Sequence, residues 1–105
     1  MAVNDSAFVN NVLIENNVSN SNGSDGVEIT ASEFAFISAV APFGIRNNEL
    51  TNNTNGISLT TAADALIDVD IFQNEISNNT LDGIVTAEVF NTTVSYTHLT
   101  LPTKA

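Results

Sequence analysis

The chain has 105 residues, the size of one small domain, and carries 12 Asp plus Glu against 2 Lys plus Arg, for a formal charge of −10. This charge repels nucleic-acid phosphates and anionic lipid headgroups, so it excludes a nucleic-acid-binding protein and a polybasic membrane anchor. Because there is no Cys, disulfide scaffolds, thiolate zinc sites and cysteine catalysis are excluded as well.

No segment is predicted to cross a membrane or to direct export. The longest nearly apolar stretch, residues 34–45, is far shorter than the roughly 20 residues that a membrane-spanning helix needs, and Pro42 interrupts it. The first residues show neither the basic nor the apolar region of a secretory signal peptide. We therefore expect a fragment, with any export signal encoded elsewhere.

Asparagine is the clearest compositional signal, with 16 of the 105 residues. These residues recur at fixed distances from aliphatic ones, which indicates an internal repeat rather than a low-complexity chain. Each copy places Asn three residues after an aliphatic residue, then a second aliphatic residue, and later a Gly-aliphatic pair. The copies are residues 14–20, 45–54 and 71–80, and their glycines are Gly26, Gly56 and Gly83.

Short strands and tight bends are predicted within each copy, because the apolar residues fall two or three apart in bursts separated by Asn or Gly. In the third copy the strands are expected at about residues 69–72, 75–77 and 83–86. No segment has the pattern of a useful helix. A repeat that cannot bury its own apolar face must stack on its neighbours, which predicts an all-β solenoid.

The repeated pattern Ile-x-x-Asn-x-Leu/Ile-x-x-Asn followed by Gly-Ile resembles the right-handed parallel β-helix repeats of the pectate-lyase-like superfamily, over residues 8–93. The resemblance implies about three coils of three short strands each. It also implies an extracellular or bacterial cell-surface location. Members of this superfamily include lyases, glycosidases, epimerases, phage tailspikes and adhesins, so the resemblance alone does not decide the function.

Equivalent residues of stacked coils lie about one strand spacing, 4.8 Å, apart. Aliphatic residues at matching positions are therefore predicted to form three inward columns that run along the solenoid. The predicted columns are Ile14, Ile45 and Ile71; Val18, Leu50 and Ile76; and Val27, Ile57 and Ile84.

Polar residues at the bends are predicted to stack in the same way. The side-chain amide of Asn both donates and accepts, so Asn17, Asn48 and Asn74 are expected to form a hydrogen-bonded ladder. Asn53 and Asn79 are expected to form a second ladder. The glycines that follow are expected to supply the positive φ of a tight turn; these are Gly26, Gly56 and Gly83.

The composition changes after residue 93. Residues 94–105 contain no Asn, no Gly and no acid, and they resemble translated sequencing-adapter read-through. The prediction is a β-helix fragment over residues 1–93 and a non-repeat tail over residues 94–105. The spacing between copies places the next strand near Tyr96, so a longer native chain, with neighbouring coils, is expected.

The segments that close the coils, residues 30–42, 60–68 and 87–93, vary most in length and are interpreted as loops. Loops often carry binding surfaces. Phe34, Phe36 and Phe43 are candidates for a surface that stacks sugars or docks a partner, although packing of the loop against the solenoid explains them better.

One candidate cation site follows from the alignment, although no cofactor is required. Glu49 and Glu75 occupy the same column of adjacent coils, where like charges repel. A calcium ion held by these carboxylates, with Asp82, would remove the repulsion.

The enzymatic interpretation finds little support within the repeats. Arg46 is the only cation there, and a solvent-facing position near Glu49 or Glu75 explains it. Asp68 and Asp70 are the nearest approach to the carboxylate pair of a glycosidase. The leading interpretation is therefore a fragment with a structural role or one that binds polysaccharide or cell-surface glycan. The alternative is part of a polysaccharide lyase or an epimerase-like enzyme whose catalytic coils lie elsewhere.

Overall fold

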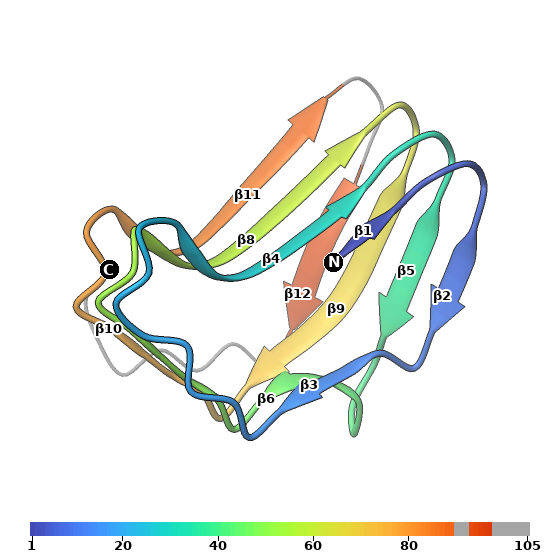
Figure 1. The fold of residues 1–105 in the computed structure, drawn as a ribbon. Helices are drawn as coiled ribbons and strands as arrows, with labels where there is room; N and C mark the ends of the chain where they lie inside the picture. Colours follow the sequence, from blue (N-terminus) through green and yellow to red (C-terminus); the bar gives the residue numbers. More distant parts are fainter. Residues whose placement is uncertain (90–92, 98–105) are drawn as a thin grey trace.

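Parallel β-strands wound into stacked coils make up the computed structural model, which describes residues 1–89 and 93–97 (Figure 1). These residues contain no helix, and every strand pairing among them is parallel. The prediction of an all-β parallel solenoid is confirmed.

The chain passes through three complete coils and begins a fourth. Coil 1 contains β1 (Ala2–Val3), β2 (Phe8–Asn10) and β3 (Leu13–Glu15). Coil 2 contains β4 (Asp25–Ala31), β5 (Phe36–Ala39), β6 (Gly44–Arg46) and β7 (Glu49–Thr51). Coil 3 contains β8 (Asn55–Ala62), β9 (Leu66–Phe72) and β10 (Glu75–Ser77), and the fourth begins with β11 (Asp82–Val89) and β12 (Thr93–Thr97).

Equivalent strands of successive coils pair side by side. One sheet has the order β1-β4-β8-β11, and a second has the order β2-β5-β9 with β12 also on β9. The distal half of β9 continues into a third sheet with β6 and β3, while β7 pairs with β10. The two longest sheets face each other in Figure 1 and enclose the core.

Two of the three predicted aliphatic columns are confirmed by the strand register. Ile14 lies beside Ile45, which lies beside Ile71. Val27 and Ile84 lie on either side of Ile57. Ile45 and Ile71 of the first column and Ile57 of the second are fully buried. Both columns therefore form the hydrophobic core of the middle coils. Burying one such side chain contributes roughly 1.5–3 kcal/mol to folding.

The column predicted to contain Val18 is wrong in the first coil. Leu50 and Ile76 pair as expected, but Val18 lies beside Glu49 and is 70% exposed. The first copy has no missing residue here, because Ile14 and Asn17 match Ile45 and Asn48 with the same spacing, so Val18 is equivalent to Glu49, one position before Leu50. A one-residue shift turns a strand side chain to the opposite face, so Val18 points outward.

The predicted role of the glycines is also wrong. Gly26, Gly56 and Gly83 lie in strands, and Gly44 is the only described glycine with positive φ. A Cβ on Gly56 would lie 2.5 Å from both Gly83 O and Ile76 Cγ2. A Cβ on Gly26 would lie 2.8 Å from Asn53 Nδ2. These positions are therefore glycine because neighbouring coils leave no room for a side chain.

Positive φ instead falls on the residue before each inward-turned Asn. At one bend these residues are Asn16, Asn47 and Gln73, with φ of 60°, 55° and 57°. At the next bend they are Ser21, Asn52 and Asn78, with φ of 60°, 59° and 55°. Asn tolerates the left-handed region better than other residues with a side chain, which accounts for many of the Asn-Asn pairs.

The segments interpreted as coil-closing loops are mostly strand. Residues 30–42 include the end of β4 and all of β5, joined by a turn at Glu33 and Phe34, both with positive φ. The equivalent turn in coil 3 is at Ala63 and Asp64. Only residues 40–43 form an insertion, and Asp70 Oδ2 accepts a hydrogen bond there from Ala41 N (2.6 Å).

The predicted boundary after residue 93 falls within β12. The backbone of residues 93–97 pairs with β9, from Thr93 beside Leu66 to Thr97 beside Asp70. Tyr96 lies beside Val69, where the spacing of the copies places the next strand. Residues 98–105, the rest of the predicted tail, lie outside the described residues.

We expect Gly56→Ala to destabilise the fold, because its Cβ would overlap backbone and side-chain atoms of coil 3 and β11. Overpacking of this kind costs roughly 1–3 kcal/mol. Gly23→Ala is the control, since no atom lies within 4 Å of the added Cβ. Urea unfolding should give a lower midpoint for Gly56→Ala alone; equal midpoints would contradict the close approach.

Candidate functional site

The first bend carries a continuous amide ladder. Asn17 Nδ2 donates to Asn48 Oδ1 (3.0 Å), and Asn48 Nδ2 donates to Asn74 Oδ1 (3.0 Å). Each of these oxygens also accepts the backbone N–H of the preceding coil's Asn, at 2.9 Å. Asn48 and Asn74 are buried, so their amides have little water to replace a lost partner. This ladder joins coils; it does not present chemistry to a ligand.

The second bend carries a ladder with a member that the sequence analysis missed. Asn53 N donates to Asn79 Oδ1 (2.9 Å), and Asn22 donates to Asn53 Oδ1 from both its N and its Nδ2, each at 2.9 Å. Asn22 was missed because aligning Val18 with Leu50 shifts the rest of the first copy by one residue. In each copy the two ladder residues are five positions apart: Asn17 and Asn22, Asn48 and Asn53, and Asn74 and Asn79. This constant spacing is the sequence signal that identifies Asn22.

The calcium ligands predicted from the sequence are not gathered into one site. Glu49 and Glu75 are neighbours in the register of β7 and β10, as the alignment implies. Asp82 instead lies on β11 beside Asn55. No group of three or more acidic, His or Cys side chains suited to a metal occurs in the part of the chain that the structure describes. Glu49 Oε2 accepts a hydrogen bond from Asn20 Nδ2 (2.8 Å), which satisfies one of its oxygens.

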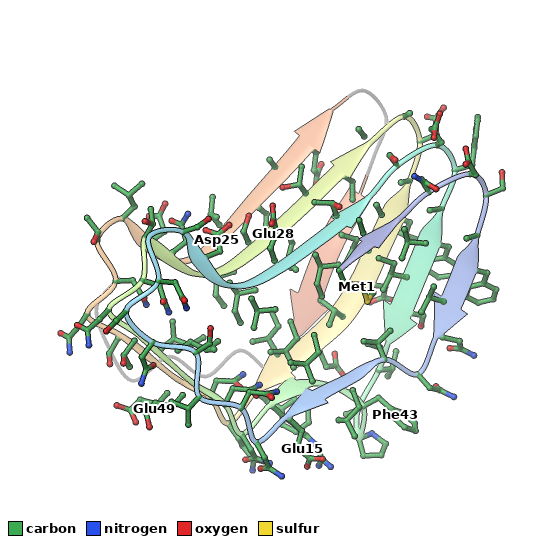
Figure 2. All side chains as sticks on the ribbon, in the orientation of Figure 1. Met1, Glu15, Asp25, Glu28, Phe43 and Glu49 are labelled. Atoms are coloured by element: carbon green, nitrogen blue, oxygen red, sulfur yellow. The ribbon has the colours of Figure 1, made fainter. Side chains whose placement is uncertain are left out.

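The lone cation of the repeats forms an ion pair within the solenoid. Arg46 Nη2 lies 2.9 Å from Glu15 Oε2, not beside Glu49 or Glu75 as expected. The two side chains are each 26% exposed, so neither is free to act on a ligand. Asp70 is 5% exposed beneath the insertion of coil 2. Figure 2 shows Glu15 and Glu49 away from Asp25 and Glu28, which lie along β4.

Two acids meet at the turns that join β1 to β2 and β4 to β5. A hydrogen bond with Asp5, followed by charge repulsion from Asp5 and a small burial effect, raises the pKa of Glu33. Both residues have positive φ and are exposed. The raised pKa follows from stacking two acidic turns directly above one another.

A hollow of about 420 Å³ lies on the uncovered inner side of coil 1. Its lining includes Ile14 and Asn17 of coil 1 and Gly26 and Val27 of coil 2, each the first member of a column that the next coils continue. The hollow is therefore the end of the core. Met1, whose amine donates to Glu28 O (2.7 Å), also lines it; Figure 2 labels both residues.

An aromatic pair lies on the outer face of β2 and β5. The rings of Phe8 and Phe36 stack with centroids 4.9 Å apart and planes 7° from parallel. Phe8 is 63% exposed, and no described strand lies on its other side. Phe34, which is 66% exposed, and Phe43 take no part in the described stack. Sequence analysis missed Phe8 because it precedes the clear part of the first copy.

A polar column runs beside the aromatic pair. Asn10, Ser38 and Asp68 lie side by side in the strand register, two residues further along than Phe8, Phe36 and Leu66. Side chains two residues apart share a strand face. Apolar and hydrogen-bonding groups are thus adjacent on one exposed surface, which we call the Phe8 face: Phe8, Asn10, Phe36 and Ser38.

No family model matches the chain, and no curated protein or solved structure is detectably similar to it. No helix able to cross a membrane occurs in residues 1–89 and 93–97.

We expect Asn48→Leu to destabilise the protein strongly. Leu keeps a similar volume but removes the hydrogen bonds to Asn17, Ile14 O and Asn74 Oδ1. Each buried group left without a partner costs roughly 1–3 kcal/mol. Asn47, although exposed, is a poor control because Leu is strained at its φ of 55°. Asn10→Leu, in an exposed strand position, is the matched control; similar urea midpoints would show that the ladder contributes little.

We expect Asp5→Asn to lower the pKa of Glu33 towards its ordinary value, because Asp5 is the largest cause of the shift. Asn accepts the positive φ of this position. A raised pKa in the folded state gives stability at low pH that is lost as the pH rises through that pKa. NMR titration of the Glu33 carboxyl measures the shift, and an unchanged value would assign it to another group.

Proposed function

We propose that this chain is a non-catalytic, carbohydrate-binding module of the parallel β-helix type, with the Phe8 face as its contact surface. The single observation that carries the proposal is the stacked and exposed pair of Phe8 and Phe36 beside a polar column. Exposed aromatic groups flanked by hydrogen-bonding side chains mark interaction surfaces on soluble proteins.

The orientation of the rings decides where a sugar would bind. Phe8 and Phe36 cover one face of each other, and the neighbouring column position beyond Phe36 is Leu66. The free ring face is therefore that of Phe8 turned away from Phe36. Ring faces, which are electron-rich, attract the C–H groups of a pyranose, whereas ring edges do not. A sugar ring stacked on Phe8 would have the exposed Asn10 amide within the same surface to bond its hydroxyls.

The charge of the chain narrows the class of glycan. A formal charge of −10 disfavours polymers of uronic acids, which are themselves anionic. The proposal is therefore a neutral glycan, on a polysaccharide or a cell surface.

The resemblance of the repeats to those of the pectate-lyase-like superfamily supports this proposal, since many of its members act on or bind carbohydrates. It also supports an extracellular or bacterial surface location. The alternative, part of a lyase or epimerase-like enzyme, has no observation in its favour among the described side chains. Residues 94–105, which resemble adapter read-through, have no part in the proposal.

Affinity electrophoresis through gels containing neutral, amino or uronate polysaccharides tests the proposal. We expect a neutral polysaccharide to retard the protein and Phe8→Ala to weaken binding by up to about tenfold, since aromatic stacking contributes roughly 0.5–1.5 kcal/mol. Phe8→Tyr should retain binding.

Leu81→Ala is the matched control, because Leu81 is 60% exposed but lies in the bend before β11. Retardation by none of the polysaccharides, or an equal effect of Phe8→Ala and Leu81→Ala, would contradict the proposal. Retardation by polyuronates alone would contradict the charge argument.

A further inference from the structure

The chain contains two Asn-Gly dipeptides, Asn22-Gly23 and Asn55-Gly56, in different surroundings. Asn-Gly is the dipeptide most prone to intramolecular attack of the backbone on the side-chain amide, because Gly leaves its own nitrogen unhindered and the backbone free to rotate. Whether the attack occurs in a folded protein depends on the room available at each site.

Asn22-Gly23 is open to this reaction. Both residues are exposed, neither lies in a strand, and a Cβ on Gly23 would have no atom within 4 Å. The Asn22 side chain is held only through its nitrogen, which donates to Asn53 Oδ1 (2.9 Å) and to Ser19 Oγ (3.0 Å).

Asn55-Gly56 is closed to the same reaction. The dipeptide begins β8, where Asn55 Nδ2 donates to Asp25 Oδ1 (2.9 Å) and Asn55 Oδ1 accepts from Asp82 N (3.2 Å). Gly56 is buried, and even an added Cβ would lie 2.5 Å from two neighbouring atoms. The backbone therefore has no space to rotate into the geometry of attack.

We propose that Asn22 is a site of spontaneous deamidation in the folded protein, and that Asn55 is protected from it. The Gly23 nitrogen bonds to Asn22 Cγ, the Cγ–Nδ2 bond breaks, and ammonia leaves, which gives a five-membered succinimide. Water then opens either carbonyl to give Asp or isoaspartate at position 22. The net change is the addition of one water and the loss of one ammonia, with no oxidation or reduction.

The modification acts on the second ladder. A carboxylate at position 22 cannot donate to Asn53 Oδ1, and it brings a negative charge to an oxygen that already carries partial negative charge. Asn53 is 1% exposed, so water cannot replace the lost donor. Isoaspartate also lengthens the backbone and displaces the donating N–H of residue 22. Deamidation therefore loosens coil 1 from coil 2 at this bend.

Peptide mapping by mass spectrometry after incubation in mildly alkaline buffer tests the proposal. In the folded protein Asn22 should convert several-fold faster than Asn55, with isoaspartate as a product, whereas in concentrated urea both should convert. Gly23→Ala, which the open space accommodates, should slow the reaction at Asn22. Equal conversion of Asn22 and Asn55 in the folded protein would overturn the proposal, as would an intact Asn22 over a period that converts the unfolded chain.

The predicted weakening of the contact between coils 1 and 2 is tested by comparing the stability of two variants. Asn22→Asp and Asn10→Asp add the same charge at exposed positions, but only Asn22 belongs to the ladder. We expect a lower urea midpoint for Asn22→Asp, and equal midpoints would overturn the proposed effect on the ladder. Neither result depends on glycan binding.

Discussion

The structure depends on the in-register stacking of parallel coils one strand spacing apart, about 4.8 Å. This spacing places each residue directly against its equivalents in the coils before and after. An amide side chain, which both donates and accepts hydrogen bonds, can bond to an identical side chain in the next coil. An apolar side chain likewise packs favourably against its equivalent. The amides of Asn17, Asn48 and Asn74 and the aliphatic column through Ile45 do so. The solenoid is therefore held together by repetition at its inward and bend positions.

In-register stacking also places like charges next to one another, which is unfavourable. Three arrangements of the acidic residues are seen. Asp25 and Asp82 are separated by Asn55, which bonds to both. Glu15 meets Arg46, the only cation of the repeats. Where acids do stack, as Asp5 and Glu33 do in exposed turns, the repulsion appears as a raised pKa of Glu33. Water screens that turn, so the like-charge stack is tolerated there.

Much of the fold could be predicted from the sequence because the repeat spacing is itself the register. The Ile columns and the position of the strand near Tyr96 follow directly from it. The failures have a local cause. Val18 was aligned with Leu50, one position too far along, whereas it lies beside Glu49, so its side chain is on the other face. The role of Gly56 was wrong because the close approach that requires it comes from atoms of the neighbouring coil, which no local turn rule describes. The Phe8 stack was missed because outer residues follow no repeat.

That last failure explains why a repeat pattern of this kind predicts architecture far better than function. Stacking constrains the inward and bend positions, and these make up the recurring pattern. Outward positions contact solvent, so the stacking energy is indifferent to their identity: one outer column reads Phe8, Phe36 and Leu66, and another reads Glu15, Arg46 and Phe72. A ligand meets only the outward side chains. Functional information in such a solenoid therefore resides where the coils differ from one another, and the stacked Phe8 and Phe36 are an aromatic instance of such a difference.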